Sequence, residues 1–386
     1  MKQVSGFTPV MLAPLIAVLL GAALLVLEPL PLQVLRNAVF DQYQRWHPRP
    51  YQNTPVRIID IDEESITRLG QWPWPRTRLA ELIQRLQDDG AAVISLDMVF
   101  AEADRTSPGA VSAAWRIPAD LRRRLEAMPD HDDALAAAIG RGRVVLGFAA
   151  KPGGIQSPPP ARPFRLIYSG APPGPFLHSF PGALGPLAVL ENAAAGCGLL
   201  TFIPDSDGVV RRIPLMAEIS NRVVPSLAAE SLRVAQGRQN YIIRTSDKQG
   251  SGVQEIRIGD LIAPTTPGGE IWLHYSRPVQ DRFIPAWKVL AGQVPREQVE
   301  GHILLVGASA QGLMDLRFNS LGQVTPGVDV HAQAIEQILE GSCLRRPAWA
   351  GAIEALVIVI GGLLIALAAL GASALVSAGV TLLILV

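Results

Sequence analysis

Carboxylates stand at the ends of two runs of β-branched residues in the first third of the chain. Asp60 and Asp62 close the first run, and Asp97 closes the second. Because the carboxyl ends of parallel strands meet at the crevice where α/β sheets bind ligands, we expect these side chains to converge there. They are suited to holding a cation or accepting hydrogen bonds from a ligand. The alternative is a structural role in which they cap helices and pair with arginine, Arg76 being the expected partner.

A rigid aromatic loop lies between the two runs. Trp72 and Trp74 alternate with two prolines and precede Arg76. The prolines restrict the backbone, and the indole rings offer large flat faces. The motif is consistent with stacking on a ligand, and equally with a loop that packs over the sheet.

Ser309, Asp315 and His331 occur in the order of a hydrolase triad, and Ser309 follows a buried-type strand. The nucleophile-elbow pattern requires glycine two residues after the serine, however, and Gln311 stands there. His331 shares a helix face with apolar residues, which is typical of a core histidine. A membrane-anchored hydrolase is therefore an alternative rather than the favoured function.

Asp205, Asp207 and Gly208 resemble the opening of a calcium-binding loop. The complete pattern needs an oxygen ligand at position five and a glutamate at position twelve, where Val209 and Met216 stand. We therefore expect a tight turn. The chain also lacks a phosphate-binding P-loop, a dinucleotide fingerprint and a zinc-peptidase motif. The sequence thus predicts no catalytic residue, metal ligand or cofactor.

The elements that position these residues are those of an α/β fold. Residues 56–62 and 92–97 are predicted strands, and the apolar spacing of 79–86 predicts a helix between them. This is the length of a βαβ unit, so the two strands are expected to pair in parallel. Residues 152–186 contain 10 prolines and 6 glycines and are predicted to be irregular. Further strands are expected at 144–148, 198–203, 209–215 (a hairpin with the preceding run), 241–244, 254–258, 271–275 and 303–307, and further helices at 130–140, 226–236 and after Gly327. We predict a mostly parallel sheet flanked by helices with inserted β-hairpins.

Composition limits the class of protein. The 386 residues include 34 Lys and Arg against 34 Asp and Glu, which excludes a chain that binds nucleic acid by bulk charge. Hydrophobic residues make up 49%, which excludes a disordered polar chain. The two cysteines, Cys197 and Cys343, are too few for a disulfide scaffold. Whether they pair with each other is left open, because their separation is unknown.

Apolar stretches at both ends predict contact with a lipid bilayer. Residues 7–27 and 351–370 are each long enough for a transmembrane helix. Residues 374–386 would begin a third, so the chain is expected to stop inside a membrane segment. The prediction is completed by a cytoplasmic tail at 1–6 and a domain at 28–350. Between the first span and the first strand, apolar residues at helical spacing indicate a helix that packs on the domain or acts as a stalk; they are Leu32, Leu35, Val39, Tyr43 and Trp46.

An ordered series of motifs resembles the type-two CHASE (CHASE2) domain, the cyclase/histidine-kinase-associated sensory extracellular domain. The motifs are 59–65 (IDIDEES), 69–76 (LGQWPWPR), 90–104 with Asp97 and Asp104, 205–215 (DSDGVVRRIPL) with Arg211, Arg212 and Pro214, 306–315, 326–332 and 346–347. Because the family is one of sensors, the resemblance implies no catalytic residue.

The resemblance also implies a topology and a role. Similar proteins place the domain outside the cytoplasm of a bacterium, anchored in the inner membrane, and join it to a cytoplasmic output domain. Such outputs include class III adenylate cyclases, histidine kinases and diguanylate cyclases, and the first is the favoured parent here. This orientation overrides a weak count of flanking arginines, which would put the domain inside. A small molecule, ion or protein would be the stimulus and the receptor would be a homodimer; an envelope scaffold is the remaining alternative.

Overall fold

The chain divides into two units, which are described separately. One comprises Asp41–Arg345, and the other comprises Met1–Phe40 with Arg346–Val386. The computed structural model describes residues 29–371 except 152, 154–156, 162–163, 247–251, 314 and 348, together with 19, 21, 23 and 27.

The described helices are α2 (Leu30–Trp46), α3 (Glu63–Leu69), α4 (Arg76–Asp88), α5 (Pro108–Ala114), α6 (Ala119–Glu126), α7 (His131–Gly140), α8 (Ala188–Ala193), α9 (Leu227–Ala235), α10 (Ala286–Leu290), α11 (Gly327–Leu339) and α12 (Ala350–Gly371). The central sheet contains β1 (Val56–Ile61), β2 (Val93–Leu96), β3 (Val144–Lys151), β6 (Gly182–Leu184), β7 (Gly196–Leu199), β16 (Phe283–Pro285) and β17 (Ile303–Ala308). A four-stranded sheet contains β4 (Arg165–Ser169), β12 (Asn240–Thr245), β13 (Val253–Ile258) and β14 (Leu261–Pro264). Smaller sheets are formed by β5 (Ser179–Phe180), β10 (Met216–Ile219) and β11 (Arg222–Pro225), by β9 (Arg212–Pro214) and β15 (Glu270–Trp272), and by β8 (Val209–Val210), β18 (Leu316–Asn319) and β19 (Val324–Pro326).

The central sheet is parallel apart from one strand. Its order is β16-β1-β17-β2-β3, and both β6 and β7 pair with β3. Only β6 runs antiparallel to its partner. The strands β1, β2 and most of β17 are buried along their length, which is why they appear in the sequence as continuous apolar runs rather than as alternating patterns.

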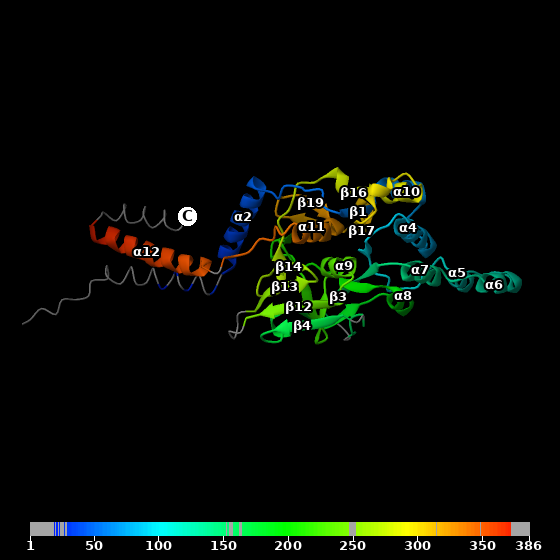
Figure 1. The fold of residues 1–386 in the computed structure, drawn as a ribbon, viewed down its shortest axis with the longest axis horizontal. Coiled ribbons are helices and arrows are strands. Elements are labelled where there is room, and N and C mark those ends of the chain that lie inside the picture. The colour runs from blue at the N-terminus through cyan, green and yellow to red at the C-terminus, as the bar shows by residue number, and fades with distance from the viewer. Residues whose placement is uncertain are drawn as a thin grey trace, which may run out of the picture. The chain divides into compact units, whose positions relative to one another are not determined.

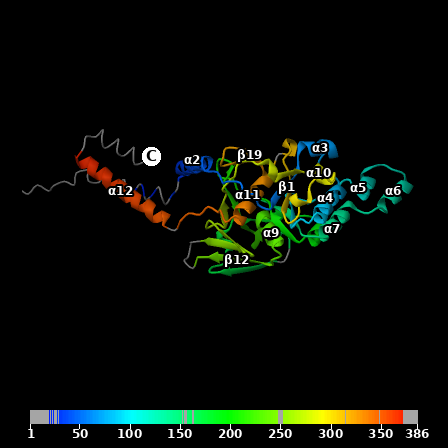
Figure 2. The same cartoon turned by 45° about the horizontal axis from the view of Figure 1, so that its top comes forward.

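Alternate side chains of these strands enter two apolar cores. Ile59 and Ile61 of β1 join the core that includes the buried face of α4, whereas Ile58 joins the core that includes α9 and α11. Helix α9 is buried nearly all round, because it packs between the central and four-stranded sheets (Figure 1). Helices α5 and α6 project outward beyond α7 in both views (Figures 1 and 2), and α6 buries none of its residues.

The predicted pairing of the first two strands is wrong in one respect. Both strands and the helix α4 between them form, but β17 inserts between β1 and β2 and pairs in parallel with each. A strand that returns from about 200 residues later in the chain is invisible to local pattern reasoning. The predicted strands at 144–148, 241–244, 254–258 and 271–275 and the helices at 130–140 and 226–236 are all present, with shifted ends.

Two further expectations are corrected. Residues 152–186 are not wholly irregular, because β4 forms there and pairs in parallel with β12. The turn at 205–208 forms, with the Gly208 amide donating to the Asp205 carbonyl at 2.8 Å. The flanking strands do not make a hairpin, however: β7 pairs with β3, and β8 pairs with β18.

The incoming helix α2 has an unexpected orientation. Its buried residues are Asp41 and Gln44, whereas the side chains of Tyr43 and Trp46 are exposed. The carboxylate of Asp41 accepts a hydrogen bond from Arg211. The side-chain amide of Gln44 donates one to the Leu273 carbonyl. The last part of the helix, from Asp41 onward, therefore contacts the domain through polar side chains and not through Tyr43 and Trp46.

The predicted fold class included transmembrane helices at both ends of the chain, and this part of the prediction is corrected. Among the described residues, no helix has the length and apolar character needed to cross a bilayer, which requires about 20 consecutive apolar residues. Residues 374–386 and nearly all of 7–27 lie outside the described residues. The described part of the chain has a mixed α/β architecture with several sheets.

Candidate functional site

A cavity of about 650 Å³ lies at the carboxyl ends of the central strands. Asp97, Met98 and Val99 follow β2 and form part of its wall, and Ala308 at the end of β17 forms another part. The remaining wall comes from Trp72, Ala149, Leu200, Thr201, Phe202, Pro204, Gly208 and residues 313 and 315–318. This is the position at which open α/β sheets bind ligands, as the sequence predicted for Asp97.

Asp97 is an unpaired buried carboxylate at this cavity. Its side chain is 6% exposed, and the nearest cationic candidate, His331 of α11, places Nε2 4.0 Å from Oδ1. That separation is too long for a hydrogen bond. Among the described residues, Oδ2 of Asp97 and both ring nitrogens of His331 have no hydrogen-bond partner. Buried polar atoms are rarely left in this state, so the pair requires an explanation.

Burial sets the charge of both groups. Desolvation raises the pKa of Asp97 to about 8, with Asp315 adding to the shift and Arg317 opposing it. Desolvation also lowers the pKa of His331 to about 3, although the nearby backbone of Leu200 opposes this without making a well-formed hydrogen bond. At neutral pH the two side chains therefore face each other mostly uncharged.

Two close approaches place α11 against the strand ends. Gly307 in β17 lies so near Val328 that an added Cβ would be 2.5 Å from the valine Cβ. Gly327, at the start of α11, leaves no space for a Cβ beside the Asp315 carboxylate. Because both positions lack a side chain, the first turn of the helix reaches the sheet, and His331 follows one turn later.

Aromatic and ionic groups line the opening. The Phe202 ring stacks at a tilt on His331, with 4.7 Å between centroids, and the Arg317 guanidinium lies 5.6 Å from the Phe202 centroid. Arg317 also pairs with Asp315 at 2.8 Å. The one cationic side chain among the described lining residues is thus already neutralised.

A smaller cavity of about 410 Å³ shares Trp72 with the first. Beside it, Asp104 accepts a hydrogen bond from the Arg76 amide at 2.7 Å, and the Arg76 side chain reaches Asp132 at 3.4 Å. Burial acts to raise the pKa of Asp104, but hydrogen bonds from Arg76 and Thr106 outweigh it and lower the value. Trp74 is only 2% exposed and packs in the core. Both indoles of the aromatic loop therefore border the smaller cavity, Trp74 from the core and Trp72 from between the two cavities.

Asp60, Asp62 and Ser309 make contacts within the fold. Asp60 accepts bonds from the Ser309 amide at 3.1 Å and the Ser309 hydroxyl at 2.7 Å. Burial raises the pKa of Asp60 to about 6, against the lowering effect of Ser309. Asp62 caps α3 by accepting from the Ser65 amide. Because Ser309 donates to Asp60 and His331 has no hydrogen-bond partner among the described residues, the hydrolase triad is not assembled.

The turn at 205–208 is held by a buried guanidinium. Arg211 bonds to Asp205 at 2.9 Å and to Asp207 at 2.6 Å. It also forms a bidentate pair with Asp41 of α2, at 2.8 and 2.7 Å. Burial acts to lower the pKa of Arg211, but the three carboxylates, Asp41 first, outweigh it and raise the value. Arg212 pairs similarly with Asp205 and with Glu270.

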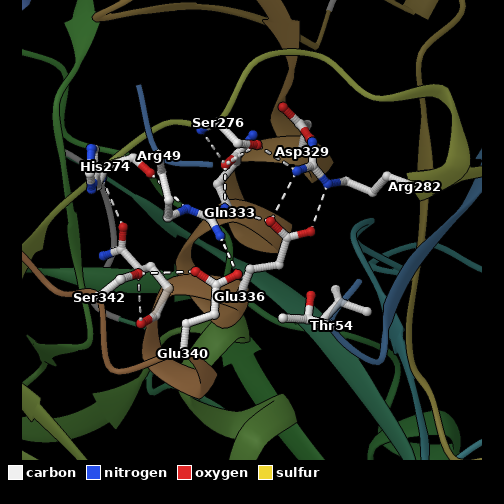
Figure 3. A network of polar contacts seen from close by, with 12 residues as sticks. Arg49, Thr54, His274, Ser276, Arg282, Asp329, Gln333, Glu336, Glu340 and Ser342 are labelled. Atoms are coloured by element: carbon white, nitrogen blue, oxygen red, sulfur yellow. Dashed lines mark hydrogen bonds and ion pairs between the residues drawn. The ribbon is translucent and has the colours of Figure 1, made fainter. Parts of the chain in front are cut away.

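A second buried network lies on the other side of α11 (Figure 3). Arg282 contacts Asp329 at 2.9 Å and Glu336 at 2.8 Å. Arg49, which follows α2, contacts Glu336 at 2.5 Å and Glu340 at 2.6 Å. Sequence reasoning missed this network and Asp41, because nothing in the local pattern distinguishes these charged residues from solvated ones.

Neither cysteine is in a disulfide. Burial raises the pKa of the Cys343 thiol to about 11, which favours the neutral thiol. The described residues also contain no group of three or more His, Cys, Asp and Glu side chains arranged to hold a metal ion. The candidate site is therefore identified by the large cavity and by the buried carboxyl group of Asp97, and not by a thiol or a metal-binding group.

The family model for the CHASE2 domain matches residues 15–369. This chain belongs to the CHASE2 domain family. Comparison of the sequence with curated proteins and with solved structures gave no match. CHASE2 domains are extracellular sensor domains of signalling proteins and are not catalysts.

Within this CHASE2 domain, the predicted residues separate into two groups. Asp97, Asp315 and Trp72 line the large cavity, with His331 directly behind Asp97. Asp60, Asp62 and Ser309 make internal contacts, and Trp74, Arg76 and Asp104 border the smaller cavity. Pro214 lies in β9 and pairs with Glu270 of β15 in the ladder.

Proposed function

We propose that this CHASE2 domain is the stimulus-binding part of a bacterial inner-membrane signalling receptor, and that the stimulus binds beside Asp97. The observation that carries the proposal is a buried carboxylate at a cavity on the ligand-binding edge of the sheet, one of whose oxygens, Oδ2, has no hydrogen-bond partner among the described residues. Leaving a polar group in this state costs stability, so its retention is explained if a ligand completes it.

Helix α11 supports a route from the cavity to the end of the domain. His331, near its start, contacts the cavity group Asp97, whereas Glu336 and the following Glu340 bind Arg49. Arg49 lies just after α2, and Glu340 lies just before the segment that leaves the domain. A ligand that moves the first turn of α11 would therefore act on the segments that enter and leave the domain.

Arg211 supports a second and shorter route. Pro204 and Gly208 line the cavity, and the intervening Asp205 and Asp207 bind Arg211. The same guanidinium holds Asp41 on α2. Movement of the cavity loop is thereby linked to the incoming helix by ion pairs on a single side chain.

The proposed output is a cytoplasmic signalling domain, with a class III adenylate cyclase favoured over a histidine kinase or diguanylate cyclase, and the receptor acts as a homodimer. To transmit a signal, the stimulus must bind two arrangements of the domain with different affinity, since equal affinity shifts nothing. The two ionic routes are the parts of the fold on which such arrangements would differ.

Location is tested by reporter fusions at residue 250. Alkaline phosphatase, which is active only after export, is expected to be active at this position in bacterial cells. β-Galactosidase, which is active only in the cytoplasm, is expected to be silent at the same position. The reverse pattern would place the domain in the cytoplasm and overturn the proposed orientation.

A further inference from the structure

Acidic side chains outnumber basic ones in the wall of the large cavity. Its described lining contains two carboxylates, Asp97 and Asp315, and one cation, Arg317. Arg317 is bound to Asp315 at 2.8 Å, so Asp97 has no ion-pair partner of its own among the described lining residues. His331 adds no charge, because burial keeps its imidazole neutral near pH 7. A negative charge on Asp97 is therefore costly until a cation arrives.

The rest of the wall favours an organic cation over a bare ion. Trp72, Phe202 and Phe318 line the cavity, together with Met98 and Leu200. Aromatic faces attract cations, and apolar walls gain from burying hydrocarbon. A metal ion would need several oxygen or nitrogen ligands, and the described residues offer no such group. An anion would meet two carboxylates and an arginine that is already paired.

We propose that the cavity binds a small organic ammonium ion, whose cationic head pairs with Asp97 and whose hydrocarbon part lies against Phe202 and Trp72. This proposal rests on the proposed function and names the chemical class of the stimulus. His331 lies behind this pair as a neutral ring, with Nε2 4.0 Å from Asp97 Oδ1 and its face stacked on Phe202.

Binding of such a ligand is coupled to release of one proton. The empty site holds Asp97 mostly protonated near pH 7, because burial raises its pKa to about 8. His331, Asp315 and Arg317 are the titratable groups that face it. When the ammonium ion binds, the Asp97 proton leaves to solvent and the carboxylate pairs with the cation. Affinity should therefore rise about tenfold per pH unit below pH 8 and level off above it.

The experiment uses the full chain and three probes that each contain an unbranched chain of four carbon atoms. These are n-butylammonium chloride, sodium n-butyrate and n-butanol, whose head groups are cationic, anionic and neutral, with sodium chloride as the ionic-strength control. We expect n-butylammonium to raise the melting temperature by mass action and the other two to leave it unchanged. Calorimetry in two buffers of different ionisation enthalpy is expected to show close to one proton released near pH 6.5.

Asp97→Asn should weaken n-butylammonium binding by about tenfold or more and abolish the proton release. The matched control is Asp88→Asn, which removes an aspartate that is 65% exposed and is expected to bind as the wild type does. The proton count on the wild type tests the proposal independently of how well the variant folds.

Equal shifts from all three probes, or an unchanged response in a folded Asp97→Asn chain, would overturn the ligand class. Binding of n-butyrate in an Arg317-dependent way would also overturn it, while leaving the cavity as a stimulus site. The reporter fusions test the location of the domain separately, so failure of the ligand class and failure of the proposed orientation give different results.

Discussion

The charge state of single buried residues determines how this domain should respond to pH. Asp97 in the folded chain has a pKa of about 8, far above its ordinary 3.8, so the folded state holds a proton that the unfolded state has lost. Stability from this group is present at low pH and is lost as pH rises towards 8. His331, with its pKa lowered to about 3, has the opposite effect up to its ordinary value of 6.5. Asp60, raised to about 6, adds to the Asp97 effect only at lower pH.

Between pH 6.5 and 8 the Asp97 effect is therefore the largest of the three, because the contributions of His331 and Asp60 fade as pH rises above 6.5. We predict that the free energy of unfolding, measured by urea denaturation, falls over this interval by up to about 1.4 kcal/mol per pH unit. Asp97→Asn should remove the slope, because asparagine cannot ionise, and Asp88→Asn should retain it. A wild-type stability that is flat or rising from pH 6.5 to 8 would show that Asp97 is already ionised in the fold.

Residue types at strand ends could be read from the sequence, but their partners could not. Asp97 was assigned to the ligand-binding edge because of its place after a buried run. The pairing of Asp60 with Ser309, 249 residues away, depends on β17 lying beside β1. Arg76 was expected to serve the strand-end carboxylates and instead reaches Asp132. Contacts between distant segments are set by the fold and leave no local signal.

At the level of elements, the packing of β17 on α11 depends on a residue without a side chain. A Cβ at Gly307 would lie 2.5 Å from the Val328 Cβ, closer than real Cβ atoms come. The obstacle is the β-carbon of a stiff β-branched residue, so the helix or strand must shift. Gly140, at the end of α7, has nothing within 4 Å of a built Cβ.

We therefore predict that Gly307→Ala lowers the free energy of unfolding by about 1–3 kcal/mol, as overpacking does in other cores. Gly140→Ala should be neutral or stabilising by up to about 1 kcal/mol, because alanine is the better helix former. Both are measured as shifts in the urea midpoint at constant slope. Equal midpoints for the two variants would show that α11 does not press on β17.

The elements that the sequence predicted well are those whose burial is uniform or strongly periodic. The apolar spacing of α4 identified its buried face, formed by Leu79, Leu82, Ile83 and Leu86. The apolar spacing of helix α2 left open whether it packs on the domain or acts as a stalk, and it gave no sign that the buried residues would be Asp41 and Gln44. The terminal segments show the same limit, since apolar composition predicted membrane spans that the described helices do not supply.

At the scale of the whole domain, the cavity loop and the incoming helix are joined through Arg211. Asp205 and Asp41 come from segments 164 positions apart, and both bind the same guanidinium. The exposed surface of each carboxylate is 11%, and that of Arg211 is 1%, so solvent screens these pairs weakly. Loss of one carboxylate should change how strongly Arg211 holds the other, because a partly buried arginine must be compensated by those that remain.

A double-mutant cycle measures that link without any ligand. We predict that Asp41→Asn and Asp205→Asn are non-additive, with an interaction energy of about 0.5–3 kcal/mol in the free energy of unfolding. The control cycle pairs Asp205→Asn with Asp88→Asn, whose partner is the exposed Arg141, and should be additive within about 0.5 kcal/mol. If the Asp41 cycle is equally additive, Arg211 binds the two segments independently, and a stimulus at the cavity loop would have to reach α2 through α11 and Arg49 instead.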